Sequence, residues 1–388
     1  MKADLAMPSL ANPQHLWLEV ESAIREQAWS QSRACATPWA RWNAYLNLVC
    51  LDVFLPWLDK EHDLKGKVWP HHGSVLSFSE LVQGICISID DLRLVLVPSD
   101  TLDWNRMYIA QEWVDIPNWI ANYYLAANLD CDAGWLEVIG FAAHQTVKEY
   151  GIYEPEDRQY EVDISALTQD LNALWVTHQF CDRLQKTSVA TMPMSLTQTQ
   201  NLITRLGNPA VIWPRLSVPF EQWRQLVEHG GWRQQLSNRR QGVPSLGSIT
   251  QWLRTQLPEA IQNIGWQLIT LPLLPEGARG KDPQLPAQIL SRQLIITGLT
   301  YELRIFPLPS KIHHWRVELR STGPGRSIPK GIKLILLTED LQPFENNVAT
   351  ASVPTEVLAL EVIVEPGEGL VWQTSPLPED YDQEVLYF

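Results

Sequence analysis

Hydrophobic side chains recur at helical spacing in two stretches near the start of the chain. The first covers residues 15–29. The second follows Thr37, which suits an N-cap, and Pro38, which suits the first helical position. Its apolar face predicts a helix that needs a covering layer. The side chains on this face are Trp42, Tyr45, Leu46, Val49, Val53 and Trp57.

Alternating hydrophobic and polar positions come next, and they predict two β-hairpins. Residues 85–89 precede 92–96, and residues 123–129 precede 135–141, with turn-forming residues between the members of each pair. A further helical pattern covers residues 164–178. Strands and helices in this order predict an α+β fold, in which a small antiparallel sheet is backed by helices.

After residue 280 the pattern changes to short strand-like runs bounded by Pro, Gly and Asp. Seven runs at this spacing predict a C-terminal antiparallel β-sandwich or barrel. The middle of the chain shows short helical patterns instead, and Pro258 should kink or split the pattern over residues 249–264. The strand-like runs are residues 293–296, 301–306, 315–319, 333–337, 358–364, 370–373 and 385–388.

Charge divides the 388-residue chain into three segments. Residues 1–190 carry a net charge of −13, residues 191–280 of +4 and residues 281–388 of −5, for a total of −14. We therefore predict an acidic α+β domain, a basic Gln-rich linker and helical segment, and a β-sandwich-like domain. The polar run over residues 195–201 is expected to belong to the linker. The negative total argues against a surface that faces nucleic acid or an anionic membrane.

Composition indicates a globular protein of the cytoplasm. Hydrophobic residues make up 45% of the chain, and its 18 tryptophans point to packed aromatic cores. No apolar run is long enough to span a membrane, and the first residues lack the pattern of a secretory signal. The five cysteines are widely spread and form no CxxC pair, so neither a disulfide framework nor a zinc site is expected.

No residue pattern identifies a catalytic site. The adjacent histidines at 71–72 and at 313–314 point in divergent directions and have no further ligand at a recognisable spacing, so no metal is expected. The sequence has no phosphate-binding loop and no hydrolase motif, and we predict no cofactor. His144 and His178 could meet Cys181 in space, which keeps an enzyme with a nonstandard His/Cys site as an alternative.

Tryptophans and arginines are the candidate contact residues. Trp113 and Trp119 flank Pro117, and we favour a core role for them over a partner-binding ledge. The arginines of the middle segment lie among Trp and Gln, a mixture that can bind nucleic acid. Their small net charge instead favours docking against the acidic head, within a chain or between chains. The interaction candidates are Trp113, Trp119, Arg233, Arg239 and Arg240.

The tryptophans that sit in helical stripes are expected to lie in the core. This set consists of Trp17, Trp42, Trp57, Trp175 and Trp252.

Several segments, in order along almost the whole chain, resemble the cyanobacterial family known as domain of unknown function 1822. The resemblance implies a cyanobacterial source and no known activity. It also implies a neighbourhood of alternative sigma factors and caspase-like peptidases. The segments that carry it are WNAYLN at 42–47, RLVLVP at 93–98, QEWVDIP at 111–117, DLNALWV at 170–176, FEQW at 220–223, QWL at 251–253, GWQ at 265–267 and LLTED at 336–340.

Three functions follow as hypotheses. The preferred one is a non-enzymatic protein-interaction or regulatory protein, which could bind a basic sigma factor through its acidic head and be cut by a caspase-like peptidase near residues 183–200. The nonstandard enzyme is the second. The third is a carbohydrate- or ligand-binding sandwich, which requires an exposed aromatic platform around Trp315 or Trp372. The sequence leaves the oligomeric state open.

Overall fold

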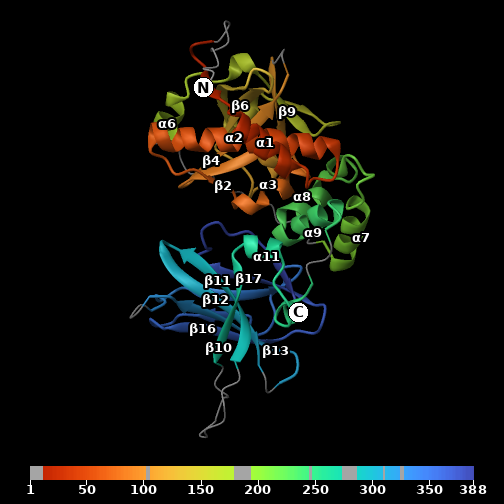
Figure 1. Cartoon of the computed structure of the whole chain (residues 1–388), viewed down its shortest axis with the longest axis vertical. Helices are drawn as coiled ribbons and strands as arrows, with labels where there is room; N and C mark the ends of the chain where they lie inside the picture. Colours follow the sequence, from red (N-terminus) through yellow and green to blue (C-terminus); the bar gives the residue numbers. More distant parts are fainter. Residues whose placement is uncertain are drawn as a thin grey trace. The chain divides into compact units, whose positions relative to one another are not determined.

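Internal contacts divide the chain into two compact units, residues 1–243 and 244–388. Helices and strands are mixed in the first unit, whereas strands dominate the second (Figure 1). The charge-based boundaries at residues 190 and 280 do not coincide with this division, because the helices after residue 195 pack within the first unit. Within the described residues, no helix is both long enough and apolar enough to cross a membrane. The computed structural model describes residues 12–101, 105–178, 194–243, 247–272, 286–308, 311–323 and 327–388.

The larger sheet of the first unit contains both predicted hairpins, β3 with β4 and β6 with β7. One pairing differs from the prediction, because β4 and β6 run parallel. The intervening chain forms β5 and α4, and such a crossover is long enough to return the chain in the same direction. The strand order is β1 (Leu16–Glu19), β7 (Trp135–Ala143), β6 (Tyr123–Asp130), β4 (Leu92–Ser99), β3 (Ile85–Ile89) and β2 (Lys67–Val68).

Helix α2 (Pro38–His62) covers one face of this sheet, with α1 (Ser22–Ser32) packed beside it (Figure 1). The Thr37 side chain accepts a hydrogen bond from the Ala40 backbone, so the predicted N-cap is confirmed. The helix predicted over residues 15–29 is wrong in its first part. Residues 16–19 form strand β1 because their backbone pairs with the edge strand β7, and the helix begins only at Ser22.

A smaller antiparallel sheet and several short helices complete this part of the unit. The helix predicted over residues 164–178 is interrupted, because Thr168 forms a β-bridge with Phe141. The sheet consists of β5 (Arg106–Ala110), β9 (Gln159–Asp163) and β8 (Ile152–Glu154); the helices are η1 (His72–Ser74), α3 (Val75–Ser79), α4 (Gln111–Asp115), α5 (His144–Tyr150), η2 (Ile164–Ala166) and α6 (Asn172–His178).

Three helices in the later part of the unit pack into one of its hydrophobic cores. They are α7 (Leu196–Leu206), α8 (Phe220–Glu228) and α9 (Gly230–Arg240), with the short η3 (Pro214–Leu216) before α8. The prediction that residues 195–201 form a linker is wrong. Ser195 and Gln198 form a capping box, in which each side chain bonds the other residue's backbone, and this pattern starts a helix.

The second unit contains two antiparallel sheets among its described residues, and their inward side chains share one core. All seven predicted strand-like runs are strands, and the helical pattern before them is split at Pro258 into α10 (Ile249–Trp252) and α11 (Glu259–Asn263). One sheet has the order β10 (Trp266–Pro272), β11 (Pro286–Ile296), β12 (Leu299–Pro307), β13 (His314–Ser321) and β16 (Val357–Ile363); the other has β15 (Val348–Thr350), β14 (Lys333–Thr338), β17 (Gly369–Ser375) and β18 (Val385–Tyr387).

Candidate functional site

A buried ion pair joins η3 to α4 in the first unit. The Glu112 carboxylate is fully buried and accepts hydrogen bonds from Arg215 Nε at 2.9 Å and Arg215 Nη2 at 2.7 Å. Trp223 Nε1 donates a third bond to it at 2.7 Å. The Arg215 guanidinium also donates to the backbone oxygens of Asp157 and Arg158. All of its nitrogens are therefore engaged inside the unit.

A second buried ion pair joins α9 to the segment after α3. Arg240 Nε donates to Glu80 Oε1 at 2.8 Å, and Ala36 N donates to Glu80 Oε2 at 2.9 Å. Burial raises the pKa of Glu80, and the hydrogen bonds from the Ala36 backbone and from Arg240 oppose this rise. Arg240 also donates to backbone oxygens at the end of α7 and in the following loop. Arg240 therefore links α9 to the end of α7 and, through Glu80, to the acidic part of the chain.

Four of the five interaction candidates from the sequence are buried. The Arg233 guanidinium lies 4.2 Å from the centre of the Phe78 ring and 5.7 Å from that of Trp119. The Trp113 and Trp119 rings pack against each other at 5.0 Å in the core, so neither forms an exposed ledge. Arg240 is inside, as described above, and Arg239 is the exposed member. Arg233 and Arg240 therefore make their contacts within the unit.

A third cluster of titratable side chains lies between α4, α5 and β9. Lys148 Nζ donates to Asp115 at 2.9 Å and to the Tyr160 hydroxyl at 2.7 Å. Burial raises the pKa of Tyr160, and the nearby Asp115 charge adds to this rise. A phenol that exchanges protons near neutral pH needs a lowered pKa. The cluster is therefore better suited to structural bonding than to proton transfer.

The histidine candidates do not assemble a site in the described residues. His144 Nδ1 lies 3.1 Å from the Tyr124 hydroxyl, and burial lowers the pKa of this imidazole. The side chain of His178 and all of Cys181 lie outside the described residues. His313 pairs with Glu365 at 2.7 Å. No group of three His, Cys, Asp or Glu side chains suitable for a metal occurs among the described residues.

The aromatic platform that a carbohydrate-binding sandwich would need is not formed by the two predicted rings. Trp315 and Trp372 are both buried. Trp372 Nε1 donates to Glu384 at 2.6 Å, and Trp266 and Arg292 bond the same carboxylate. The second unit therefore uses Trp372 to hold its two sheets together, and this hypothesis loses its support.

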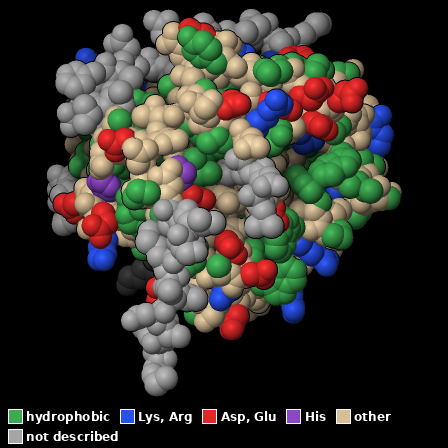
Figure 2. All heavy atoms as spheres, turned by 90° about the horizontal axis from the view of Figure 1, so that it is seen from above, with side chains coloured by type: hydrophobic (Ala, Val, Ile, Leu, Met, Phe, Trp, Pro, Cys, Tyr) green, Lys and Arg blue, Asp and Glu red, His purple; other side chains and the backbone are tan. Residues whose placement is uncertain are grey.

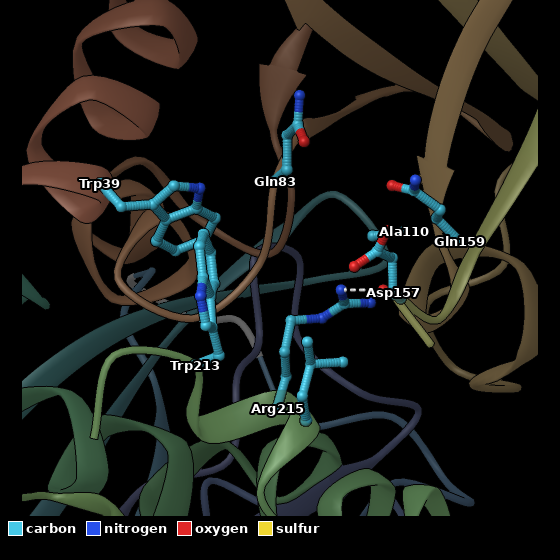
Figure 3. A pocket seen from close by; sticks show the side chains of 8 residues that line it. Trp39, Gln83, Ala110, Asp157, Gln159, Trp213 and Arg215 are labelled. Carbon is cyan, nitrogen blue, oxygen red and sulfur yellow. Dashed lines mark hydrogen bonds between the residues drawn. The ribbon is translucent and has the colours of Figure 1, made fainter. Parts of the chain in front are cut away.

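The first unit has a surface hollow of about 250 Å³, which we consider as a candidate for binding. Figure 3 shows two indole rings, Trp39 and Trp213, on one side of it, and Asp157 and Gln159 across from them. The ring centroids are 4.8 Å apart and the planes meet at 69°. Trp213 is 42% exposed, which is unusual for so large an apolar side chain. The remaining lining residues are Gln83, Ala110, Arg215 and Leu216.

Sequence patterns could not indicate this hollow. Its residues come from the start of α2, from the loops after α3 and before β9, from the end of β5, and from η3. Trp39 follows Pro38, which predicts the helix start, so the sequence indicates that Trp39 lies in the first turn of a helix. The sequence does not indicate which residues surround its ring. Acidic side chains do not mark a single surface either. On the face seen in Figure 2 they lie in several separate groups, with basic and hydrophobic side chains between them.

Comparison with known proteins gives one match. A family model described as "Protein of unknown function (DUF1822)" matches residues 18–387, which is nearly the whole chain. No curated protein matches the chain. No solved structure matches it.

Proposed function

The chain belongs to the family of proteins of unknown function described as DUF1822, and since that family assigns no activity, we propose a function from the geometry. The proposed function is that of a non-enzymatic protein-interaction protein. Its first unit receives a side chain of a partner protein in the hollow between Trp39 and Trp213. The cyanobacterial source implied by the resemblance stays a prediction.

The pair of indoles, with Trp213 exposed and Trp39 half-buried, is the observation that carries this proposal. Pockets for small molecules and cofactors usually measure about 300–1,000 Å³, whereas this hollow has a volume of about 250 Å³. Its size therefore favours one inserted side chain over a cofactor. Tryptophans at the edge of such hollows are typical of the few residues that contribute most of the binding energy between proteins.

The polar groups of the hollow favour a basic side chain. The Arg215 guanidinium already donates to Glu112 and to two backbone oxygens, so four of its five N–H groups are engaged inside the unit. The Asp157 side chain is exposed. Its charge helps to raise the pKa of the neighbouring Arg215, and no side-chain hydrogen bond of this carboxylate is found among the described residues. A lysine or arginine placed there would meet this carboxylate and the faces of two indoles, which attract cations.

A sigma factor is the partner that we propose to test first. Residues 1–243 contain 19 Lys and Arg and 28 Asp and Glu, which gives this unit a net charge of −9. Such a unit attracts a basic partner at long range. Cutting by a caspase-like peptidase near residues 183–200 stays a separate prediction, and α7 already begins at Leu196.

The test compares binding of a purified alternative sigma factor to the full chain and to three variants. Trp213→Ala should weaken binding by about thirtyfold, the effect of losing a central aromatic contact. Asp157→Asn should weaken it less, by about threefold to tenfold. Tyr150→Ala is the matched control, because Tyr150 is 71% exposed and does not line the hollow. If Trp213→Ala binds the sigma factor as tightly as Tyr150→Ala does, the hollow is not the contact site. If the wild-type chain does not bind the sigma factor at all, the proposed partner is wrong.

A further inference from the structure

A second hollow lies on the first unit where α1 ends and α2 begins, and its volume is about 230 Å³. It differs from the Trp39–Trp213 hollow in its charge. Here two guanidinium groups stand beside two indole rings. The lining residues are Trp29, Ser32, Arg33, Pro38, Arg41 and Trp42.

The two indoles are held in place by contacts with Tyr45. Trp42 stacks on Tyr45 with ring centroids 5.1 Å apart, and Trp29 meets the same ring nearly edge-on at 5.8 Å. Trp42 Nε1 also donates to Asp100 at 2.9 Å. Trp29 is 45% exposed and Trp42 is 37% exposed, so the prediction that Trp42 lies in the core is wrong. Rings that are fixed before binding lose little conformational entropy when a ligand packs on them.

The two arginines have no acidic partner among the described residues. Arg41 Nε donates to the backbone oxygen of Cys35 at 2.8 Å, which fixes its stem and leaves its terminal nitrogens available. Arg33 is exposed and is the C-cap residue directly after α1. By contrast, Arg106, Arg215 and others in this unit each meet a carboxylate within 3 Å. Two unpaired guanidinium groups beside one hollow are unexpected in a unit with a net charge of −9.

We propose that this hollow binds an acidic peptide segment of a partner protein, with a carboxylate held by Arg33 and Arg41 and a neighbouring apolar side chain packed on Trp29 and Trp42. Guanidinium groups bind carboxylates through short, charge-assisted hydrogen bonds, often two at a time. The negative net charge of the unit disfavours a long polyanion such as nucleic acid, which needs an extended positive track. A short acidic segment places its charge on the arginines alone.

The proposal does not depend on the Trp39–Trp213 hollow, since the ligand there is a cation. Pro38 and Trp39 are neighbours in sequence, however, and they line the two hollows separately. A variant at Trp213 therefore serves to tell the two sites apart. It should leave binding of an acidic peptide unchanged.

Binding is measured by fluorescence anisotropy with the full chain and a labelled peptide of four Glu-Leu repeats. The neutral reference is the same peptide with Gln in place of Glu, and the polyanion reference is an eight-nucleotide oligothymidylate. We expect the acidic peptide to bind at least about tenfold more tightly than the neutral one at low salt, and to lose this advantage as salt screens the charges. Equal binding of the two peptides, or tighter binding of the oligonucleotide, would overturn the proposal.

Variants locate the site. Arg33→Gln should weaken binding of the acidic peptide by at least about threefold, and Arg33→Gln with Arg41→Gln by at least about tenfold. Arg205→Gln is the matched control, because Arg205 is an exposed arginine on α7 outside both hollows. Arg33→Gln should fold like the wild type, because the Arg33 side chain makes no hydrogen bond or ion pair with the described residues. The single variant therefore still tests the site if the double variant fails to fold. If the double variant, checked as folded by circular dichroism, binds like Arg205→Gln, the site is not where we place it.

Discussion

The strongest stability prediction concerns Arg240, which fastens α9 to the rest of the first unit. Its guanidinium donates to Glu80 at 2.8 Å and to the backbone oxygens of Leu206 at 2.9 Å and Val211 at 3.0 Å. Arg240→Leu keeps an apolar stem but leaves the Glu80 carboxylate buried without its cation. It also removes the donor from both carbonyl groups.

The expected size follows from the distance and the burial. Two unit charges 2.8 Å apart attract by about 6 kcal/mol at an effective dielectric constant of about 20. Burial of both charges offsets much of this attraction, so the net cost of removing one partner from a buried pair is about 3–5 kcal/mol. We expect Arg240→Leu to lower the free energy of unfolding of the first unit by that amount.

Urea denaturation, followed by circular dichroism and fitted with separate transitions for the two units, measures this loss. Arg239→Leu is the control, because Arg239 is the exposed neighbour and should change stability by less than about 0.5 kcal/mol. Glu80→Leu with Arg240→Leu removes both charges and should be less destabilising than Arg240→Leu alone. Equal losses for Arg240→Leu and Arg239→Leu, or a double variant as unstable as the single one, would refute the reasoning.

The same variant has a defined dependence on pH. Burial raises the pKa of Glu80 above its ordinary value of 4.5. A carboxyl with a raised pKa in the folded state favours folding while it is protonated, and this contribution is lost as the pH rises through the folded pKa. Removal of Arg240 raises this pKa further. The stability deficit of Arg240→Leu should therefore be full at neutral pH and shrink as the pH falls towards 4.5.

Two further predictions concern buried thiols and a left-handed glycine. Burial raises the pKa of Cys35 and Cys86 to about 12 and also raises that of Cys50, so iodoacetamide at about pH 8 should label them only after unfolding, as read by peptide mass mapping. Gly84 has φ of +92° and an added Cβ would lie 3.1 Å from the Leu96 oxygen; Gly84→Ala should cost about 1–3 kcal/mol. Gly242→Ala, with open space at φ +68°, should cost only about 1 kcal/mol, and equal melting temperatures would contradict this.

The elements that the sequence predicted correctly are those with strong local signals. Helix α2 has a capping threonine, a first-turn proline and a long apolar stripe, and the strands of the second unit alternate between turn residues. The errors arise where distant pairing decides the structure. Residues 16–19 become a strand because β7 offers an edge, and β4 pairs parallel with β6 because the crossover between them permits it. Neither partner is visible in a local window.

The capping box is an exception, because its signal was present in the sequence. Ser195 followed by Gln198 is the pattern that begins a helix, but the surrounding polar residues favour a linker. The buried side of α7 is narrow and includes Ile203 and Leu206. A helix with so few apolar positions can be predicted from sequence only when the capping pattern is given more weight than the polar composition.

The sites were less predictable than the fold, because they are formed by residues far apart in sequence. Helical spacing alone does not predict that Trp113 is buried and Trp42 is exposed, because the burial of each ring depends on which elements pack against it. The Trp39–Trp213 hollow requires η3 to lie beside the start of α2. The hollow between α1 and α2 is more local, because its residues fall between positions 29 and 42. A cluster of two tryptophans and two arginines around a helix start was the available signal.

The structure shows how the charges of each sequence segment are distributed between buried pairs and the surface. The +4 of residues 191–280 predicts docking against the acidic head, and Arg215 and Arg240 do pair with Glu112 and Glu80 inside the first unit. Arg224 instead pairs with two glutamates of its own helix. Arg33 and Arg41, which have no carboxylate partner among the described residues, lie in the acidic segment. The sign of a segment therefore governs long-range attraction of a partner, whereas the sign of each hollow depends on which charges the fold has left unpaired. A basic partner that carries a short acidic segment would satisfy both hollows, and the variants at Trp213 and Arg33 separate the two contributions.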